Sequence, residues 1–213
     1  MAGAMEQVTH VDVLVLNGDI FDFRWSILPN QAATIAAALD WIDSLIDAFK
    51  GESIHYVLGN HDCLEAFSSR LGDLSHKRPL FACHELRLIL NRNLFLHGDC
   101  ANRMMNEAAL KKYRRSWSSH RQRGKFGRAL YQVADATGLS RRFHERHFPE
   151  EATVSRVIHH LGHVLPAWRE EIDHCYFGHT HRPFANHLRD GVRFHNTGSG
   201  IRGMGFHPLA FTP

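Results

Sequence analysis

Four short blocks that combine glycine with aspartate, asparagine or histidine carry the side chains most suited to binding metal ions. The blocks are Gly18-Asp19-Ile20-Phe21-Asp22, Gly59-Asn60-His61-Asp62, His97-Gly98-Asp99 and Gly178-His179-Thr180-His181. Carboxylate, amide and imidazole ligands without thiolate suit a divalent cation such as Mn²⁺, Fe²⁺ or Zn²⁺. If the fold brings the four blocks together, they would form a two-metal site of the kind that hydrolyses phosphate esters.

Short apolar runs precede the blocks, so the sequence predicts that strands position them. These runs cover residues 11–16, 55–58, 94–96 and 174–177. In an open α/β sheet, ligands bind at the carboxyl ends of the strands, which is where the four blocks fall. The pattern therefore favours a layered α/β architecture whose functional site lies along one sheet edge.

Other segments supply the supporting elements. Asn30 can cap a helix over residues 31–50, whose apolar positions recur on one face and which Gly51 would end. Residues 86–90 are expected to pair with residues 94–96 as neighbouring strands. Arg189-Asp190-Gly191 is typical of a hairpin turn, here between strands at residues 186–188 and 192–195.

Length and composition indicate an ordinary globular chain. Its 213 residues predict one domain over residues 1–213, and 44% apolar with 22% charged residues are typical values. The four cysteines show no paired spacing, which favours a reducing cytoplasm. The first residues do not resemble a secretory signal, and no apolar run approaches the ~18 residues of a membrane span.

The chain changes character at about residues 100–170, where a helical, basic insertion is expected. Residues 103–169 hold 14 Lys and Arg against five Asp and Glu, whereas the rest of the chain holds 11 against 17. A solvated helical bundle could carry such charge without any function. Because the insertion lies between two of the metal-ligand blocks, we favour a role that faces the substrate.

In their order and spacing, the four blocks resemble those of the calcineurin-like metallophosphoesterases, and the resemblance extends over residues 11–199. It implies two β-sheets flanked by helices, with two divalent metal ions at the complete site. Manganese is expected ahead of iron or zinc.

The resemblance also implies which residues bind metal. Asp19 corresponds to the carboxylate that bridges both ions. Asn60, His97 and His179 correspond to ligands of the second metal, and His181 corresponds to a ligand of the first.

Four further polar residues receive roles from the same resemblance. His61 is similar to the histidine that stabilises the transition state or protonates the leaving group. Asp62 is expected to orient that imidazole. Asp22 and Asp99 are expected to brace the loops from outside the ligand set.

One block of the family pattern is absent. The family begins with a strand that ends in Asp-x-His, which supplies two ligands of the first metal. His10 and Asp12 are the only candidates upstream, and they lie at the wrong end of a strand that is ~20 Å long. Two interpretations follow: an N-terminally shortened chain, which we favour because His61, Asp62 and His181 remain, or a protein with one proper metal and reduced activity.

Within the family, the long insertion and the sequence Arg182-Pro183 after the last block look most like UDP-2,3-diacylglucosamine pyrophosphohydrolases. His61 stands where that subgroup typically has arginine, and the closing residues 196–199 look like the general family. The expected reaction is hydrolysis of a phosphomonoester, phosphodiester or pyrophosphate bond, with a nucleotide-linked lipid as one substrate. The alternative is a non-catalytic scaffold such as the retromer scaffold subunit of this superfamily.

The expected partner is an anionic, amphipathic phosphorylated substrate. A basic run on a helix of the insertion would meet its charges, and apolar residues nearby would meet its acyl chains. The basic residues are Lys111, Lys112, Arg114 and Arg115, and the apolar ones are Leu110, Trp117, Phe126, Leu130 and Tyr131. The same charges would allow peripheral contact with an anionic inner membrane. Nucleic acid is not favoured, because the insertion has no recognised binding motif and few stacking aromatics.

Overall fold

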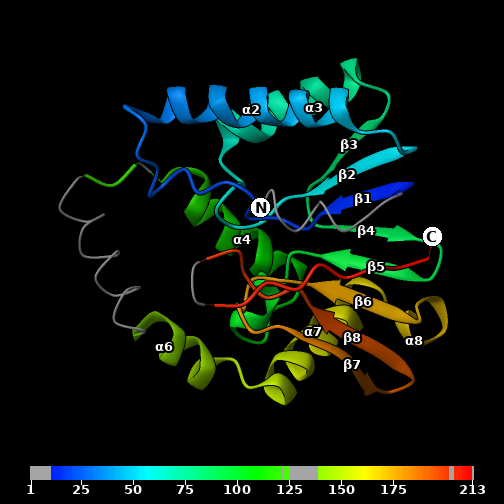
Figure 1. Cartoon of the computed structure of the whole chain (residues 1–213). Helices are drawn as coiled ribbons and strands as arrows, with labels where there is room; N and C mark the ends of the chain where they lie inside the picture. The colour runs from blue at the N-terminus through cyan, green and yellow to red at the C-terminus, as the bar shows by residue number, and fades with distance from the viewer. Residues whose placement is uncertain (1–10, 121, 125–138, 202–203, 213) are drawn as a thin grey trace.

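Two β-sheets form the centre of the computed structural model, which describes residues 11–120, 122–124, 139–201 and 204–212 (Figure 1). The first sheet has three parallel strands in the order β1-β2-β3. The second has five strands in the order β4-β5-β6-β8-β7, parallel at its centre and antiparallel at both ends. The strands are β1 (Val13–Leu16), β2 (Ser53–Val57), β3 (Phe81–His84), β4 (Arg87–Leu90), β5 (Asn93–Leu96), β6 (His174–Phe177), β7 (Phe184–Arg189) and β8 (Val192–Asn196).

Helices α2 (Gln31–Ala48) and α3 (Glu65–Lys77) cover the outer face of the three-stranded sheet (Figure 1). The side chain of Asn30 accepts a hydrogen bond from the backbone N–H of Ala33 at 2.9 Å, so the predicted cap is confirmed. The apolar face of α2 packs with residues from the sheet and from α3 to form one core cluster, in which Ile42, Ile54 and Phe67 are fully buried. Burial of this face holds the helix on the sheet.

A second helical layer covers the outer face of the five-stranded sheet. It contains the short helix η1 (Asp99–Asn102), α4 (Glu107–Ser118), α7 (Glu150–Val164) and α8 (Trp168–Glu171), while α6 (Leu139–His147) precedes α7. Val154, Val157 and Leu161 of α7 are completely buried in one core cluster with Leu94 and Phe177 of the sheet. Thus α7 belongs to the core, although the sequence placed it within the basic insertion.

Between the sheets lies a smaller apolar layer. Its buried members are Val57, Leu88, Phe95 and Tyr176. Successive strand residues point to opposite faces, so Phe95 faces the other sheet while Leu94 and Leu96 face the helices. Helices, sheet, sheet and helices therefore form four layers, and the expected class of two sheets flanked by helices is confirmed.

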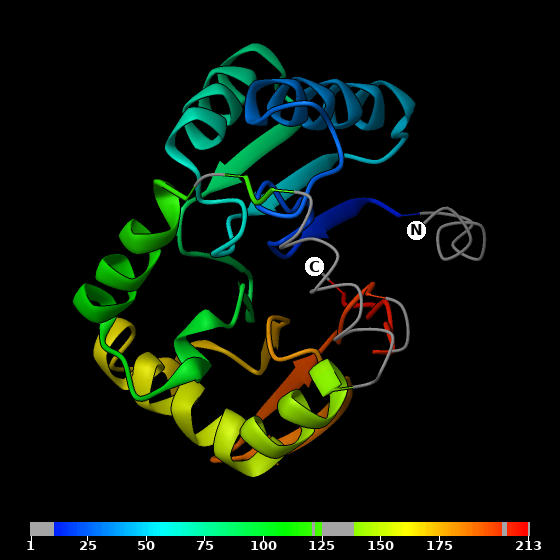
Figure 2. The same ribbon diagram turned by 90° about the vertical axis from the view of Figure 1, so that its left-hand side faces the viewer.

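The parallel strands of both sheets run in the same direction (Figure 1). Their carboxyl ends lie on the side that faces the viewer in Figure 2, where the loops after β1, β2, β5 and β6 gather. The expected hairpin after β7 is also present: Arg189 pairs with Val192, and Asp190 and Gly191 between them have φ of +52° and +84°. The fold thus delivers all four polar blocks to one edge.

The basic charge of the insertion is confined to its first part. Residues 103–148 hold 12 Lys and Arg against three Asp and Glu, whereas residues 149–169 hold two of each kind. The core helix α7 is therefore not part of the basic surface, which belongs to α4, α6 and the chain between them. Among the described residues, no helix is both long and apolar enough to cross a membrane.

Candidate metal centre

Asp19 is brought to the sheet edge by a tight turn directly after β1. Gly18 and Asp19 have φ of +78° and +51°, a region that glycine and aspartate enter more readily than most residues. A Cβ atom on Gly18 would lie 2.5 Å from the Nδ1 atom of His97. A Cβ on Gly59 would lie 2.2 Å from the Oδ1 atom of Asp19. Both glycines are therefore required for the loops to approach so closely.

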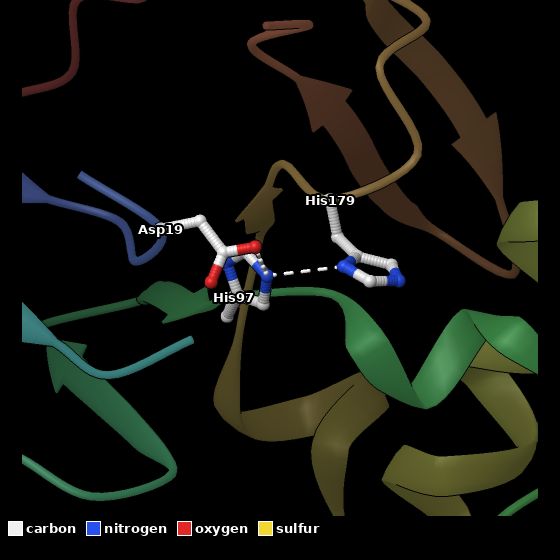
Figure 3. Close-up of side chains that lie close together, drawn as sticks. All are labelled: Asp19, His97 and His179. Carbon is white, nitrogen blue, oxygen red and sulfur yellow. Dashed lines mark hydrogen bonds and ion pairs between the residues drawn. The ribbon is translucent and has the colours of Figure 1, made fainter. Parts of the chain in front are cut away.

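Asp19, His97 and His179 come together at this edge from three different loops (Figure 3). The Oδ2 atom of Asp19 lies 3.0 Å from Nε2 of His97, which lies 3.1 Å from Nδ1 of His179. One ligand atom from each residue falls within 4.8 Å of the other two. One carboxylate and two imidazoles at this spacing are a suitable ligand set for a transition-metal dication.

Two carbonyl oxygens fix the orientation of the imidazoles. The Nδ1 atom of His97 lies 3.1 Å from the backbone oxygen of Asn17, and Nε2 of His179 lies 3.1 Å from Oδ1 of Asn102. A carbonyl oxygen can only accept, so each of these ring nitrogens carries the hydrogen and donates it. The other nitrogen of each ring then faces the shared centre, where it can offer its lone pair to a metal ion once it carries no proton. Asn102 belongs to none of the four sequence blocks, so its contact with His179 was not predicted.

The electrostatics of the trio also favour a cation. Burial lowers the pKa of His97, but the charge and hydrogen bond of Asp19 more than offset this effect and raise the pKa to about 9. Burial, and then the charge on His97, lowers the pKa of His179 to about 3. Protonated His97 thus supplies a positive charge beside Asp19 while His179 stays neutral, and binding of a dication would release that proton.

Asn60 is a buried amide that follows Gly59 in the second block. Its side chain is 2% exposed, and neither its amide oxygen nor its amide nitrogen has a hydrogen-bond partner among the described residues. A buried amide without partners costs about 1–3 kcal/mol. Asn60 lies between Gly59, which packs against Asp19, and His61, whose backbone N–H donates to Asp19 at 2.8 Å. An ion bound by Asp19 could therefore satisfy the Asn60 oxygen as well.

His181 lies outside the trio. Its ring stacks on that of His144 from α6 with 4.4 Å between centroids, and its buried Nδ1 has no partner among the described residues. Asp12, one of the two upstream candidates, precedes β1 and is therefore at the opposite end of that strand from Asp19. His10 lies outside the described residues. The structure thus brings together three of the five expected ligands, with Asn60 adjacent and His181 stacked on the insertion.

His61 is held by a carboxylate, but not by the expected one. Its Nδ1 lies 3.1 Å from Oδ2 of Asp22. Asp62 instead accepts hydrogen bonds from the Tyr56 hydroxyl at 2.6 Å and from the Gly59 backbone N–H at 2.5 Å. The expectation that Asp62 orients His61 is therefore wrong: Asp62 is fully buried beneath the loop and braces it, while the more exposed Asp22 can reach the imidazole.

Asp99 and Arg114 form a buried ion pair that corrects another expectation. The guanidinium Nε and Nη2 atoms bind the two carboxylate oxygens of Asp99 at 2.8 and 2.9 Å. Arg114 is only 5% exposed, so it cannot meet a substrate as one of the basic residues of a lid. Asp99 braces the helix start next to His97, as expected. Removing Arg114 would leave a buried carboxylate without its partner, which typically costs 3–5 kcal/mol.

Comparison with known proteins agrees with this geometry. A family model described as calcineurin-like phosphoesterase matches residues 3–183 of the chain. The chain belongs to the calcineurin-like phosphoesterase family. Membership supports a metal-dependent phosphoesterase activity in general and implies divalent metal ions. The trio of Asp19, His97 and His179, with the unsatisfied amide of Asn60, fits such an ion.

Two solved structures are similar to this chain at a general level. One is the phosphopantetheinyl hydrolase PptH from Mycobacterium tuberculosis, at 13% identity and a TM-score of 0.47, which covers 95% of this chain and 85% of that one. The other is wild-type Vps29 complexed with Zn²⁺ from Entamoeba histolytica, at 15% identity and a TM-score of 0.33, covering 94% and 80%. No curated protein sequence matches this chain.

Proposed function

We propose that this protein hydrolyses a phosphomonoester, phosphodiester or pyrophosphate bond at a metal centre held by Asp19, Asn60, His97 and His179, with Mn²⁺ as the expected ion. The convergence of Asp19 with two imidazoles of fixed orientation is the observation that carries the proposal. A bound dication supplies Lewis-acid polarisation of the phosphoryl oxygens and lowers the pKa of water.

His61 is positioned to act on the leaving group. Its Nδ1–H donates to Asp22, which leaves Nε2 to hold a second proton when the ring is an imidazolium. Burial lowers the pKa of His61, but the hydrogen bond to Asp22 and the charge of Asp19 raise it above its ordinary value. As water attacks phosphorus and the bond to the leaving oxygen breaks, the Nε2 proton of His61 passes to that oxygen.

The scaffold alternative keeps one supporting observation. His181 stands apart from the trio and packs on His144, so only one compact three-residue ligand group is present among the described residues. A protein with one incomplete centre could retain the fold as a binding surface. Catalysis and scaffolding therefore need a direct test.

Turnover of p-nitrophenyl phosphate and of bis-p-nitrophenyl phosphate, with and without added Mn²⁺, provides that test. We expect Mn²⁺-dependent release of p-nitrophenol that is abolished by chelation and restored by the metal. The control is the same protein with Mg²⁺ alone, since Mg²⁺ prefers oxygen ligands to imidazole. Absence of turnover in a protein that retains stoichiometric Mn²⁺ would contradict the enzymatic reading and favour the scaffold.

We further propose that the basic part of the insertion selects an anionic, amphipathic substrate such as a nucleotide-linked lipid. Lys112 and Arg115 of α4 are exposed, as are the apolar side chains of Met104 and Phe143. Leu110 was expected on this surface but is buried in the core. Phe126, Leu130 and Tyr131 lie outside the described residues.

The double variant Lys112→Gln/Arg115→Gln tests this selection without disturbing Asp99. Exposed charges contribute about 0.2–1 kcal/mol each, so we expect the loss of two to lower kcat/KM on a UDP-linked diacyl lipid by up to about thirtyfold. Turnover of p-nitrophenyl phosphate should change far less. Arg70→Gln, which removes an exposed charge from α3, is the control. Equal losses on both substrates, or none, would make this part of the insertion a solvated surface.

A further inference from the structure

An aromatic side chain from the insertion forms one wall of the site beside His61. The ring centroid of Trp117, near the end of α4, lies 4.7 Å from the ring centroid of His61, and the two ring planes meet at 39°. The rings of Tyr113 and His120 pack edge-to-face on the same indole, with centroid distances of 6.1 and 4.9 Å. Trp117 therefore lies on the leaving-group side of the site if His61 has its proposed role of protonating the leaving oxygen.

This wall is fixed to the loop that follows Asp22. Four hydrogen bonds join the segment after α4 to the segment that leads into α2. The Nε2 atom of Gln122 donates to the backbone oxygens of Ser26 and Leu28, both at 2.8 Å. The Nε2 atom of Gln31 donates to the backbone oxygen of His120 at 2.9 Å, and the backbone N–H of Arg123 donates to the backbone oxygen of Arg24 at 2.8 Å. These bonds tie the two segments together beside Trp117 and His61.

Arg24 lies against this wall, and the charge of the nearby Asp22 acts on it without a direct ion pair among the described residues. Its guanidinium carbon is 5.4 Å from the ring centroids of both Trp25 and Trp117. Within the described ranges, no Asp or Glu oxygen lies at ion-pair distance from its side chain. The Oδ1 atom of Asp22 accepts the backbone N–H of Arg24 at 2.9 Å, while Oδ2 of the same carboxylate binds His61. Arg24 and His61 are thus tied to each other through Asp22.

A guanidinium stacked against aromatic rings still has free N–H groups along its edge. These groups match the two oxygens of a phosphoryl or carboxylate group, which they can bind in a bidentate manner. Arg123 adds a second positive charge nearby: burial and then the charge of Arg123 lower the pKa of Arg24. Neither arginine forms an ion pair with a described acidic residue, and two such like charges form a favourable place for an anion.

We propose that Arg24 and Arg123, next to Trp117, form a second oxyanion subsite on the leaving-group side of His61. The inference rests on the proposed phosphoesterase function and deepens it. It assigns the substrate to esters whose leaving group carries its own phosphoryl group, as in a diphosphate, in preference to simple monoesters. The reacting phosphoryl group would bind at the residues of the metal centre, and Arg24 and Arg123 would hold the second one.

The kinetic test compares pyrophosphate, whose leaving group is phosphate, with phenyl phosphate, whose leaving group is uncharged after protonation. Arg24→Gln should reduce kcat/KM on pyrophosphate at least about tenfold more than on phenyl phosphate, because each charge-assisted bond to the second anion is lost. Arg24→Lys should recover part of that difference, since it keeps the charge but not the planar fork. Arg70→Gln should leave both substrates unchanged.

Binding of inorganic phosphate separates this inference from the function on which it rests. Calorimetry on Asp19→Asn, which weakens the metal centre, should still detect phosphate at the subsite, and the double variant Asp19→Asn/Arg24→Gln should lose it. If wild-type protein hydrolyses neither ester but Arg24 still binds phosphate, the proposed function fails and the subsite stands. Equal kinetic losses on the two esters, or phosphate binding that does not depend on Arg24, would overturn the subsite.

Discussion

Replacing Asp19 with alanine is expected to abolish both metal retention and turnover. The Asp19 carboxylate is the only acidic member of the trio, and its Oδ2 lies 3.0 Å from His97. Outer-sphere partners of a metal typically contribute 10- to 100-fold to affinity, so loss of a direct carboxylate ligand should exceed about a hundredfold. Elemental analysis after gel filtration measures the metal, and p-nitrophenyl phosphate turnover measures the activity.

Two control variants separate loss of the ligand from unfolding and from a general loss of negative charge. Asp19 has φ of +51°, where alanine is strained, so Asp19→Asn should be tested in parallel because asparagine tolerates that conformation. Asp12→Ala removes an exposed carboxylate from the other end of β1 and should leave metal content unchanged. Equal metal in Asp19→Ala and wild type would rule out the assigned centre.

Most elements that position the site were predictable because their signals are local. The apolar run before Asp19 ends in a glycine turn, and Asn30 caps the helix that begins at Gln31. Helix α3 and strand β3 were not foreseen. Only Phe67 and Leu71 of α3 are buried, and β3 has four residues of mixed polarity, so neither shows a clear period in the sequence.

The residues that interact across the site were less predictable, because their partners are distant in sequence. Adjacency suggested Asp62 as the partner of His61, but the strand–loop geometry turns Asp62 into the core and brings Asp22 to the imidazole. Similarly, Arg114 belongs to a basic run in the sequence, yet its position on α4 faces Asp99. Charge patterns predict a surface only when the buried face of the helix is known.

His61→Ala is expected to keep the metal but to lose about 10²–10⁴ in rate, the usual scale of general acid catalysis. The side chain of His61 binds Asp22 and stacks on Trp117, and it is not part of the compact ligand group. Only its backbone N–H contacts Asp19, at 2.8 Å, and alanine preserves that hydrogen bond. Metal content by elemental analysis should therefore match wild type.

The size of the rate loss should depend on the leaving group. An alkyl phosphate expels a poor leaving group that needs a proton as its bond to phosphorus breaks, whereas p-nitrophenolate can depart without one. His61→Ala should therefore reduce turnover of the alkyl ester much more than that of p-nitrophenyl phosphate. Asp22→Asn, which keeps the imidazole but weakens its orientation, should show the same dependence with a smaller loss. A loss of turnover that is the same for both esters would mean that His61 stabilises the phosphoryl group without donating the proton. Loss of metal in His61→Ala would place its side chain among the ligands.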